Sequence, residues 1–374
     1  MSEDLESPRA LAPGELLFEA PVRRRKPPRH LADLTTAQRR EVVEELGLPG
    51  FRADQVSRQY FTRLVRDPQE WTDVPAAARQ QLADALTPSM MSLVREVTCD
   101  NGMTRKTLWR LHDGVLVESV LMRYPDRVTM CVSSQVGCGM NCPFCATGQS
   151  GLTRNLSTAE IVDQVVAGAA ELARGDVPGG VGRVSNVVFM GMGEPLLNYA
   201  NVITAIDRIT SPKGLGMAMK RITVSTAGIA KMIEKMADDG VKFNLAVSLH
   251  SAIDRKRSTL MPINETNSLE TLGEALKYWY QKTKSKVTYE YVVWKGINDT
   301  EADVQALLKF CKLIPCKVNL IEYNNIGDEG FSQASPEIVN RYMDVLEQHG
   351  ITTRVRRSRG KDIDAACGQL ANKF

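Results

Sequence analysis

The segment Gly137-Cys138-Gly139-Met140-Asn141-Cys142-Pro143-Phe144-Cys145-Ala146-Thr147-Gly148 carries most of the information about fold and chemistry in this sequence. Its three cysteines follow the spacing C-x3-C-x2-C, and the Gly, Asn and Pro residues among them predict a loop. Three thiolates on one loop can converge on a soft metal centre. Zinc would require a fourth ligand, whereas an iron–sulfur cube with three thiolate ligands keeps one iron open for chemistry. We therefore expect Cys138, Cys142 and Cys145 to bind an iron–sulfur cluster.

The composition excludes several classes of protein. The chain has 374 residues, of which 43% are hydrophobic and 24% charged, as is ordinary for a globular protein of two or three domains. No apolar run is long enough to span a membrane, and the acidic N-terminus does not resemble a secretory signal. We therefore expect a cytoplasmic protein whose eight cysteines serve metal or redox chemistry rather than structural disulfides. The net charge of +3 does not by itself indicate a nucleic-acid partner.

The N-terminal region is expected to be accessory to the rest of the chain. Residues 1–33 are proline-rich and should form a disordered tail. Apolar periodicity and capping signals then predict a small helical domain over 34–91. Its three helices are expected from Thr35 or Thr36 to Gly47, over 53–65 and over 76–86.

A β-meander is expected to follow over 92–123. Three β-rich segments are separated by Asp100-Asn101-Gly102 and by Asp113-Gly114, which are strong hairpin signals because these residues tolerate a positive φ. The expected strands are 92–99, 104–111 and 115–122.

Strands and helices alternate over the rest of the chain. Helices are expected at 158–174, 228–239, 267–282, 299–311 and 335–347, and strands at 184–190, 221–226, 243–249, 286–294, 316–322 and 351–357. Repeated βα units predict an α/β fold with a parallel sheet, either doubly wound or curled into a full or partial barrel. In all of these folds the active site lies at the carboxyl ends of the strands.

The cysteine loop, with the aromatic Phe144 before its last cysteine, resembles that of radical S-adenosylmethionine (SAM) enzymes. The longer string from Cys131 through Gly148 resembles the RlmN/Cfr family of RNA methyltransferases, and the C-terminal Ala366-Cys367-Gly368-Gln369-Leu370 matches the same family. The resemblance extends from about Phe51 to the C-terminus. It implies a partial (β/α) barrel as the radical SAM core over 124–358, with a C-terminal segment over 359–374. It also implies a [4Fe-4S] cluster with one open iron and two SAM molecules per turnover.

The resemblance assigns SAM contacts to residues at strand ends. Gly193 and Glu194 match the turn that binds the SAM amino group, for which a carboxylate and a close backbone approach are suited. Ser225, the run Ser248-Leu249-His250 and Asn324 match positions that contact the ribose, adenine or methionine moiety. Each of these residues taken alone would be interpreted as a strand-end cap or a turn residue.

Three further residues match catalytic positions of the family. Cys367 matches the cysteine that accepts a methyl group from SAM and carries it, after radical formation, to the RNA base. Cys131 matches the cysteine that resolves the resulting thioether through a transient disulfide. Glu118 matches the proton acceptor that removes the ring hydrogen. Cys99, Cys311 and Cys316 match no role, and we expect them to be packed thiols.

The family resemblance implies RNA substrates. We expect methylation of adenosine carbon 2 in 23S rRNA, and of the adenosine 3′ to the anticodon in some tRNAs, because the overall form is more similar to RlmN. Carbon-8 methylation, as in Cfr, is the alternative within the family. A radical SAM enzyme acting on a protein or small molecule, and a cluster-bearing RNA-binding module, are alternatives of other classes.

Local charge is expected to contact the RNA phosphates, because such contacts position a nucleic acid without reading its sequence. The expected patches are the C-terminal cations of residues 351–374 and the run Arg255-Lys256-Arg257. The resemblance further implies a flavodoxin-type electron donor, and we expect a monomer.

Overall fold

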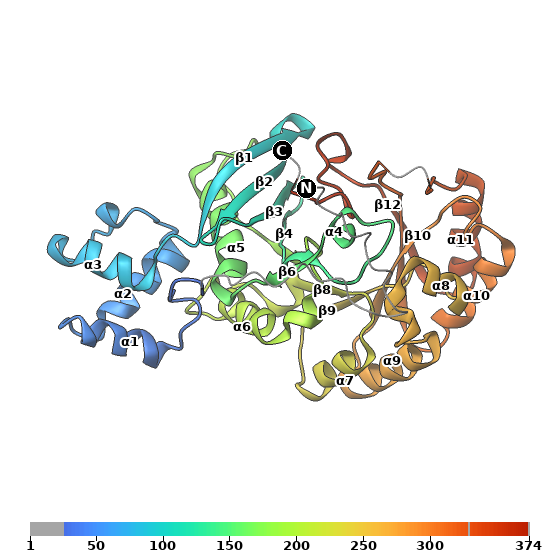
Figure 1. Cartoon of the computed structure of the whole chain (residues 1–374), viewed down its shortest axis with the longest axis horizontal. Helices are drawn as coiled ribbons and strands as arrows, with labels where there is room; N and C mark the ends of the chain where they lie inside the picture. The colour runs from blue at the N-terminus through green and yellow to red at the C-terminus, as the bar shows by residue number, and fades with distance from the viewer. Residues whose placement is uncertain (1–25, 328–329, 373–374) are drawn as a thin grey trace, which may run out of the picture.

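Ten strands form one curved sheet in the computed structural model, which describes residues 26–327 and 330–372 (Figure 1). The strand order is β1-β2-β3-β4-β7-β8-β9-β10-β11-β12. Strands β1 to β4 are antiparallel to one another, and every pair from β4 to β12 is parallel. A separate two-stranded sheet pairs β5 with β6. The expected α/β fold with a mostly parallel, barrel-like core is thus confirmed.

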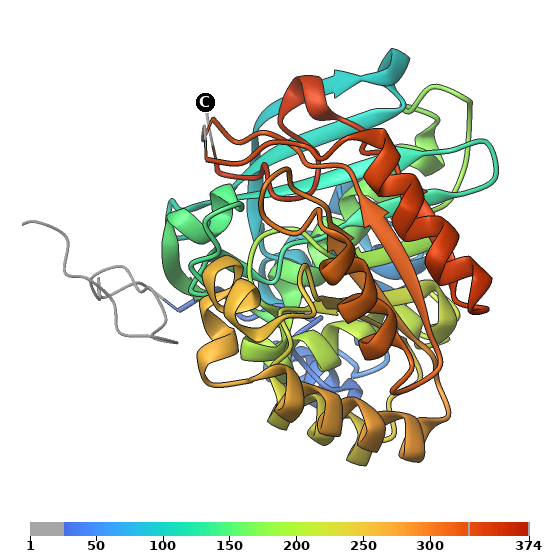
Figure 2. The same ribbon diagram turned by 90° about the vertical axis from the view of Figure 1, so that its right-hand side faces the viewer.

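The strands are β1 (Met91–Cys99), β2 (Thr104–Leu111), β3 (Leu116–Arg123), β4 (Val128–Cys131), β5 (Gln135–Cys138), β6 (Gly151–Asn155), β7 (Asn186–Phe189), β8 (Ile222–Thr226), β9 (Asn244–Ser248), β10 (Val287–Val292), β11 (Cys316–Ile321) and β12 (Thr352–Arg356). The α-helices are α1 (Thr36–Glu45), α2 (Arg52–Arg58), α3 (Ala76–Leu86), α4 (Ala146–Gln149), α5 (Thr158–Arg174), α6 (Tyr199–Thr210), α7 (Ala230–Asp238), α8 (Asp254–Leu260), α9 (Leu269–Thr283), α10 (Glu301–Cys311) and α11 (Pro336–Gln348). Figures 1 and 2 show that the long helices lie on the outside of the curved sheet, with α1 to α3 as a group beyond α5 and β1.

Local sequence accounts for most of these elements. Every helix and strand expected in the barrel region is present with bounds within two residues of the expectation. The meander is present as β1 to β3, and Asp100, Asn101, Gly102 and Gly114 have the positive φ that their hairpin signals predict. The helix expected over 53–65 differs, because α2 continues from Gln59 to Arg63 as a π-helical turn that ends at left-handed Leu64.

Helix α6 was not expected, although its buried Val202, Ala205, Ile206 and Ile209 follow the helical period. This helix packs against α5, whose side chains are nearly all buried between the sheet and its neighbours. The N-cap Ser157 and Glu160 of α5 form a capping box, which fixes the point where this buried helix begins.

Two sequence-based expectations on the surface are wrong. Residues 1–25 of the expected tail lie outside the described residues, but Leu31 is fully buried and donates its backbone N–H to Leu86 O at 2.7 Å. The expected tail therefore ends before residue 33. The run Arg255-Lys256-Arg257 is not a free cationic patch, because Lys256 pairs with Asp303 at 2.7 Å and Arg257 is buried.

A buried carboxylate is one of the links between the helical N-terminal unit and the core, beside the bonds of Arg208 to Ala32 O and Leu34 O. Asp163 of α5 accepts hydrogen bonds from Arg66 at 2.7 and 2.9 Å and from the Tyr60 hydroxyl at 2.9 Å. A buried carboxylate with these partners resists separation of the two units, because removing one partner would leave a charge buried without compensation. In the described part of the chain, no helix is both long and apolar enough to cross a membrane.

Candidate active site

The carboxyl ends of the parallel strands open into one cavity with about 1070 Å³ of empty space. Most of the expected site residues line it, from β7 and β8 across to β11 and the C-terminal segment. The residues on its wall that the sequence predicted are Cys138, Cys142, Cys145, Gly193, Glu194, Ser225, Ser248, His250, Asn324 and Cys367. The sheet topology explains why residues far apart in the sequence line one cavity, because the carboxyl ends of neighbouring parallel strands lie at the same edge of the sheet.

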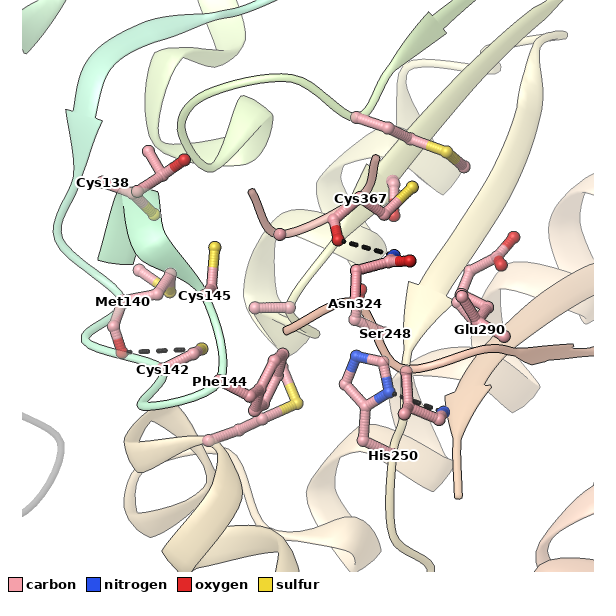
Figure 3. A pocket seen from close by; sticks show the side chains of 18 of the residues that line it. Cys138, Met140, Cys142, Phe144, Cys145, Ser248, His250, Glu290, Asn324 and Cys367 are labelled. Atoms are coloured by element: carbon pink, nitrogen blue, oxygen red, sulfur yellow. Dashed lines mark hydrogen bonds between the residues drawn. The ribbon is translucent and has the colours of Figure 1, made fainter. Parts of the chain in front are cut away.

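The three cysteines of the loop lie together on one side of this cavity. Figure 3 shows Cys138, Cys142 and Cys145 grouped there, opposite Cys367 and Asn324. Cys138 ends β5, and the loop turns back through left-handed Asn141, so that the Cys145 N–H bonds to Cys142 O at 3.1 Å. The short helix α4 begins directly after Cys145. The local turn thus brings the three thiols to one place.

The donor set and the environment of these thiols fit an iron–sulfur cluster. Burial raises the pKa of Cys138 to about 12 and also raises the pKa values of Cys142 and Cys145. Three buried thiolates without a cation would repel one another, whereas a bound metal centre keeps its thiolate ligands deprotonated. Among the described residues, no group of three or more His, Cys, Asp or Glu side chains is arranged around a single metal ion.

Glu194 is suited to bind a cationic group in the cavity. Its carboxylate is buried and accepts backbone N–H bonds from Leu196 at 2.9 Å and Ala227 at 2.7 Å. Burial raises its pKa to about 7. Because an ammonium group would offset the cost of burying this charge, the position fits the SAM amino group. Gly193 precedes it with a φ of +98°, and a Cβ there would lie 2.5 Å from that of Gln135, so a larger residue would not fit.

His250 is held as a neutral ring. Its Nδ1 accepts the Val292 N–H at 3.2 Å, and burial lowers its pKa to about 3. The ring packs edge-on against Phe144, with centroids 4.9 Å apart, and near Trp294. Nδ1 is therefore an acceptor, so the proton of the neutral ring lies on Nε2. The aromatic surroundings are suited to an adenine ring.

Asn324 lies between the cavity and the C-terminal segment (Figure 3). Its Nδ2 donates to Cys367 O at 3.1 Å and to Ser358 Oγ at 3.0 Å. Its Oδ1 is buried without a hydrogen-bond partner. An unpaired buried amide oxygen is costly, so this atom is available for a ligand donor. Ser225 and Ser248, at the ends of β8 and β9, line the same wall.

Cys131 and Cys367 share a second, smaller pocket next to the main cavity. Cys131 ends β4, while Cys367 lies in the C-terminal segment and lines both pockets. Burial, together with the nearby Cys367 thiolate, raises the pKa of Cys131 to about 12. Arg356 lines both pockets as well, and the negative charge of Cys367 is the chief cause of its raised pKa. The structure thus brings the two cysteines of the expected methyl transfer together.

All eight cysteines are free thiols, so the structure contains no Cys131–Cys367 disulfide. Cys99, Cys311 and Cys316 are buried, as expected for packed thiols.

Three expected site residues do not line the main cavity, and one of them, Cys131, lines only the smaller pocket. Leu249 is fully buried in the core, where its backbone N–H bonds to Glu290 O and its carbonyl accepts from Arg257 Nε. Glu118 lies on β3 beside a different pocket, and both of its carboxylate oxygens already have partners.

Glu290 and Arg356 are polar residues of the cavity wall that the sequence did not assign to the site. Glu290 of β10 is buried, and its Oε2 has no hydrogen-bond partner, with Arg356 Nη1 at 3.9 Å. The sequence does contain a sign of Glu290, because an acidic residue within the otherwise apolar strand segment Tyr289 to Val292 is unusual. Arg356 was counted only as one of several C-terminal cations.

The comparison with known proteins agrees with this geometry. The radical SAM superfamily matches residues 132–311. A crystal structure of a radical SAM methyltransferase from Sphaerobacter thermophilus has a TM-score of 0.88 and 40% identity, covering 92% of this chain and 100% of that one. By fold, cysteine motif and site, the chain is a radical SAM enzyme, a class that uses a [4Fe-4S] cluster and SAM.

Its relatives define the family more narrowly. A probable dual-specificity RNA methyltransferase RlmN from Thermobifida fusca is 53% identical over 363 residues, covering 96% of this chain and 99% of the relative. One of the same name from Streptomyces griseus is 51% identical over 361 residues, covering 96% and 98%. The chain therefore belongs to the RlmN family.

Proposed function

We propose that this protein methylates carbon 2 of an adenosine in 23S rRNA, at the peptidyl-transferase centre, and of the adenosine 3′ to the anticodon in some tRNAs. The observation that carries the proposal is the position of Cys367, which faces the cavity of the cluster cysteines and also the small pocket of Cys131. A carrier thiol needs access to both the methyl donor and a resolving thiol. The names of the relatives support RNA as the substrate and favour carbon 2 over carbon 8.

Each group in the cavity has a proposed binding role. Cys138, Cys142 and Cys145 ligate three irons of the cluster, and Glu194 with Gly193 binds the SAM amino group. Ser225, Ser248, His250 and Asn324 contact the rest of SAM, and Leu249 supports this wall through its backbone bonds to Glu290 and Arg257. When bound, the cluster and two SAM molecules supply a methyl group for Cys367 and a carbon radical that activates that methyl group.

Cys367 and Cys131 form the covalent intermediates of the proposed reaction. Cys367 loses its proton, accepts the methyl group as a thioether, and presents the activated carbon to the base. Glu118 accepts the ring hydrogen as a proton, and the one electron that the base adduct must lose to become aromatic again would return to the oxidised cluster. The Cys131 thiolate then attacks the Cys367 sulfur, so that an S–S bond forms and the bond from sulfur to the transferred carbon breaks. That carbon keeps the electron pair and takes up a proton, and the disulfide must be reduced before the next turnover.

RNA positioning is proposed to depend on the helical unit α1 to α3, the meander and exposed cations near Cys367. Arg354 and Arg357 are exposed on or just after β12 and line a pocket that shares Glu322 and Tyr323 with the main cavity. They are suited to phosphate contacts. A flavodoxin-type donor, a monomeric state and a cytoplasmic location belong to the same proposal.

The test is anaerobic reconstitution of the protein with iron and sulfide, followed by incubation with SAM, a reductant and fragments of 23S rRNA or tRNA. Mass mapping of the modified nucleoside locates the added methyl group. The proposal requires 2-methyladenosine. 8-Methyladenosine would favour the Cfr-type alternative, and a cluster-loaded protein that modifies no RNA would reject the proposal.

A further inference from the structure

The C-terminal residues 364–372, named here the strap, contribute Cys367, Gly368 and Leu370 to the wall of the cavity. In its middle the strap is bound to the cluster loop and to the end of β11. Ala146 N donates to Gly368 O at 2.8 Å, and Asn324 Nδ2 donates to Cys367 O at 3.1 Å. These contacts fix the backbone position of Cys367 in the cavity wall.

One pair of charged side chains holds both ends of the strap on the meander, and Asn372 Nδ2 adds a bond to Leu116 O at 2.9 Å at the C-terminal end. Lys106 of β2 donates from Nζ to Asp364 O at 3.2 Å, at the beginning of the strap. Glu118 of β3 accepts at Oε2 from the backbone N–H groups of Ala371 at 2.9 Å and Asn372 at 3.1 Å, at its end. Lys106 Nζ and Glu118 Oε1 are themselves 3.3 Å apart.

Both side chains are buried, so each charge is compensated mainly by the other. The Glu118 side chain is 1% exposed and that of Lys106 is 9% exposed. When one partner of a buried ion pair is removed, the other charge is left without compensation and tends to move toward water or to take up a proton. The pocket beside them, lined by Arg95, Lys106, Glu118 and Asp364, offers such a route. Loss of Lys106 would therefore weaken the fastening at both ends of the strap.

We propose that Lys106 and Glu118 form a latch that holds the strap on the meander, and that Lys106 is thereby a positioning residue for Cys367. The latch follows from the contacts above, whereas its consequence for methyl transfer rests on the proposed function. In the latched state both Glu118 oxygens are engaged and neither faces the cavity of Cys367. Because Glu118 lines a pocket other than those of Cys367, it can reach a base held at Cys367 only if the strap moves.

Amide hydrogen exchange of the full chain, reconstituted with its cluster under anaerobic conditions, tests the latch directly. We expect Lys106→Met to raise the exchange rate of the peptide that contains residues 364–372 by about tenfold, which corresponds to ~1.4 kcal/mol. Lys106→Arg should restore protection, because it keeps the charge and the donor. The matched control is Arg110→Met, which removes an exposed cation from the same strand. Unchanged exchange in Lys106→Met would overturn the latch.

Glu118→Gln provides a second variant in case Lys106→Met does not fold. It keeps an oxygen acceptor for the Ala371 and Asn372 N–H groups but removes the ion pair, and we expect exchange to rise in the same peptide. Protection equal to that of the wild type would show that the charge of Glu118 does not hold the strap.

The positioning role is tested by two measurements on Lys106→Met. The rate at which SAM methylates Cys367, followed by the mass of its peptide, should fall about tenfold, while the Kd for SAM stays within about twofold of the wild type. Faster strap exchange with wild-type methylation of Cys367 would reject the positioning role. If wild-type Cys367 accepts no methyl group, the proposed function fails, and the exchange data still decide the latch.

Discussion

Asn324 joins the cofactor cavity to the catalytic segment, because its side-chain amide donates to the backbone carbonyl of Cys367 at 3.1 Å. The same side chain leaves a buried Oδ1 without a partner. A residue proposed to contact SAM therefore also holds the backbone of the cysteine proposed to accept the methyl group.

Asn324→Ala should slow methylation of Cys367 more than it weakens SAM binding. Loss of one uncharged hydrogen bond is worth about 1 kcal/mol, so the Kd for SAM should rise by less than about tenfold. The methylation rate should fall further, because the carbonyl of Cys367 also loses its anchor. Single-turnover methylation and equilibrium binding of SAM separate the two effects. Equal losses in both would show that Asn324 acts on SAM alone.

Replacing Cys138, Cys142 or Cys145 by Ala should abolish the iron–sulfur cluster. Two thiolates cannot anchor the cube that three are proposed to hold, so the iron and sulfide content after reconstitution should drop and reductive cleavage of SAM should stop. Cys311→Ala is the matched control, because it removes a buried thiol away from the cavity. A loop variant with full iron content and normal 5′-deoxyadenosine production would reject the ligand assignment.

Cys131→Ala and Cys367→Ala should fail in different ways. Without Cys367 no methyl carrier exists, so no protein–RNA adduct can form. Without Cys131 the carrier still adds to the base, but the product is not released. We expect Cys131→Ala purified from cells to contain RNA bound covalently through Cys367, as shown by nuclease digestion and mass spectrometry of that peptide. A nucleotide-free peptide together with normal RNA methylation would assign release to another thiol.

Glu194 should make the stability of the SAM-free protein depend on pH. Its folded-state pKa is raised from 4.5 to about 7, so between these values the folded state binds more protons than the unfolded state. Stability contributed by this group is therefore lost as the pH rises through this window, by on the order of 3 kcal/mol at most. Urea unfolding at pH 5 and pH 8 measures this effect. Glu194→Gln, which stays neutral, should lack this component of the pH dependence, and identical pH profiles would contradict the prediction.

Glu194 should also make SAM affinity pH-dependent. The carboxylate form is the one that attracts an ammonium group, so the Kd for SAM should decrease as the pH rises through about 7. Titration of the wild type and Glu194→Gln at several pH values provides the measurement. A Kd that is independent of pH in the wild type would place the amino group elsewhere.

Local sequence was sufficient for most of the elements, α6 excepted, and for the cluster loop. The period of apolar residues, the capping residue Thr35 and the hairpin signals at Asn101 and Gly114 act over a few residues, so they predict helices, strands and turns directly. The three thiols of the loop are close in sequence, and their turn at Asn141 brings them together with little help from the rest of the fold. The family resemblance supplied the roles of Cys131, Cys367 and the residues at the strand ends.

Only the tertiary structure decided which distant residues meet. Cys131 and Cys367 share a pocket because β4 lies beside β3 and the strap returns to bind β2 and β3. The same return engages Glu118 with Ala371 and Asn372, which no local pattern indicates. Burial of Arg257 likewise depends on the packing of α8 against strand ends that lie elsewhere in the chain. Local periodicity specifies how each segment folds, whereas long-range packing determines whether a charged side chain faces solvent, a ligand or another charge.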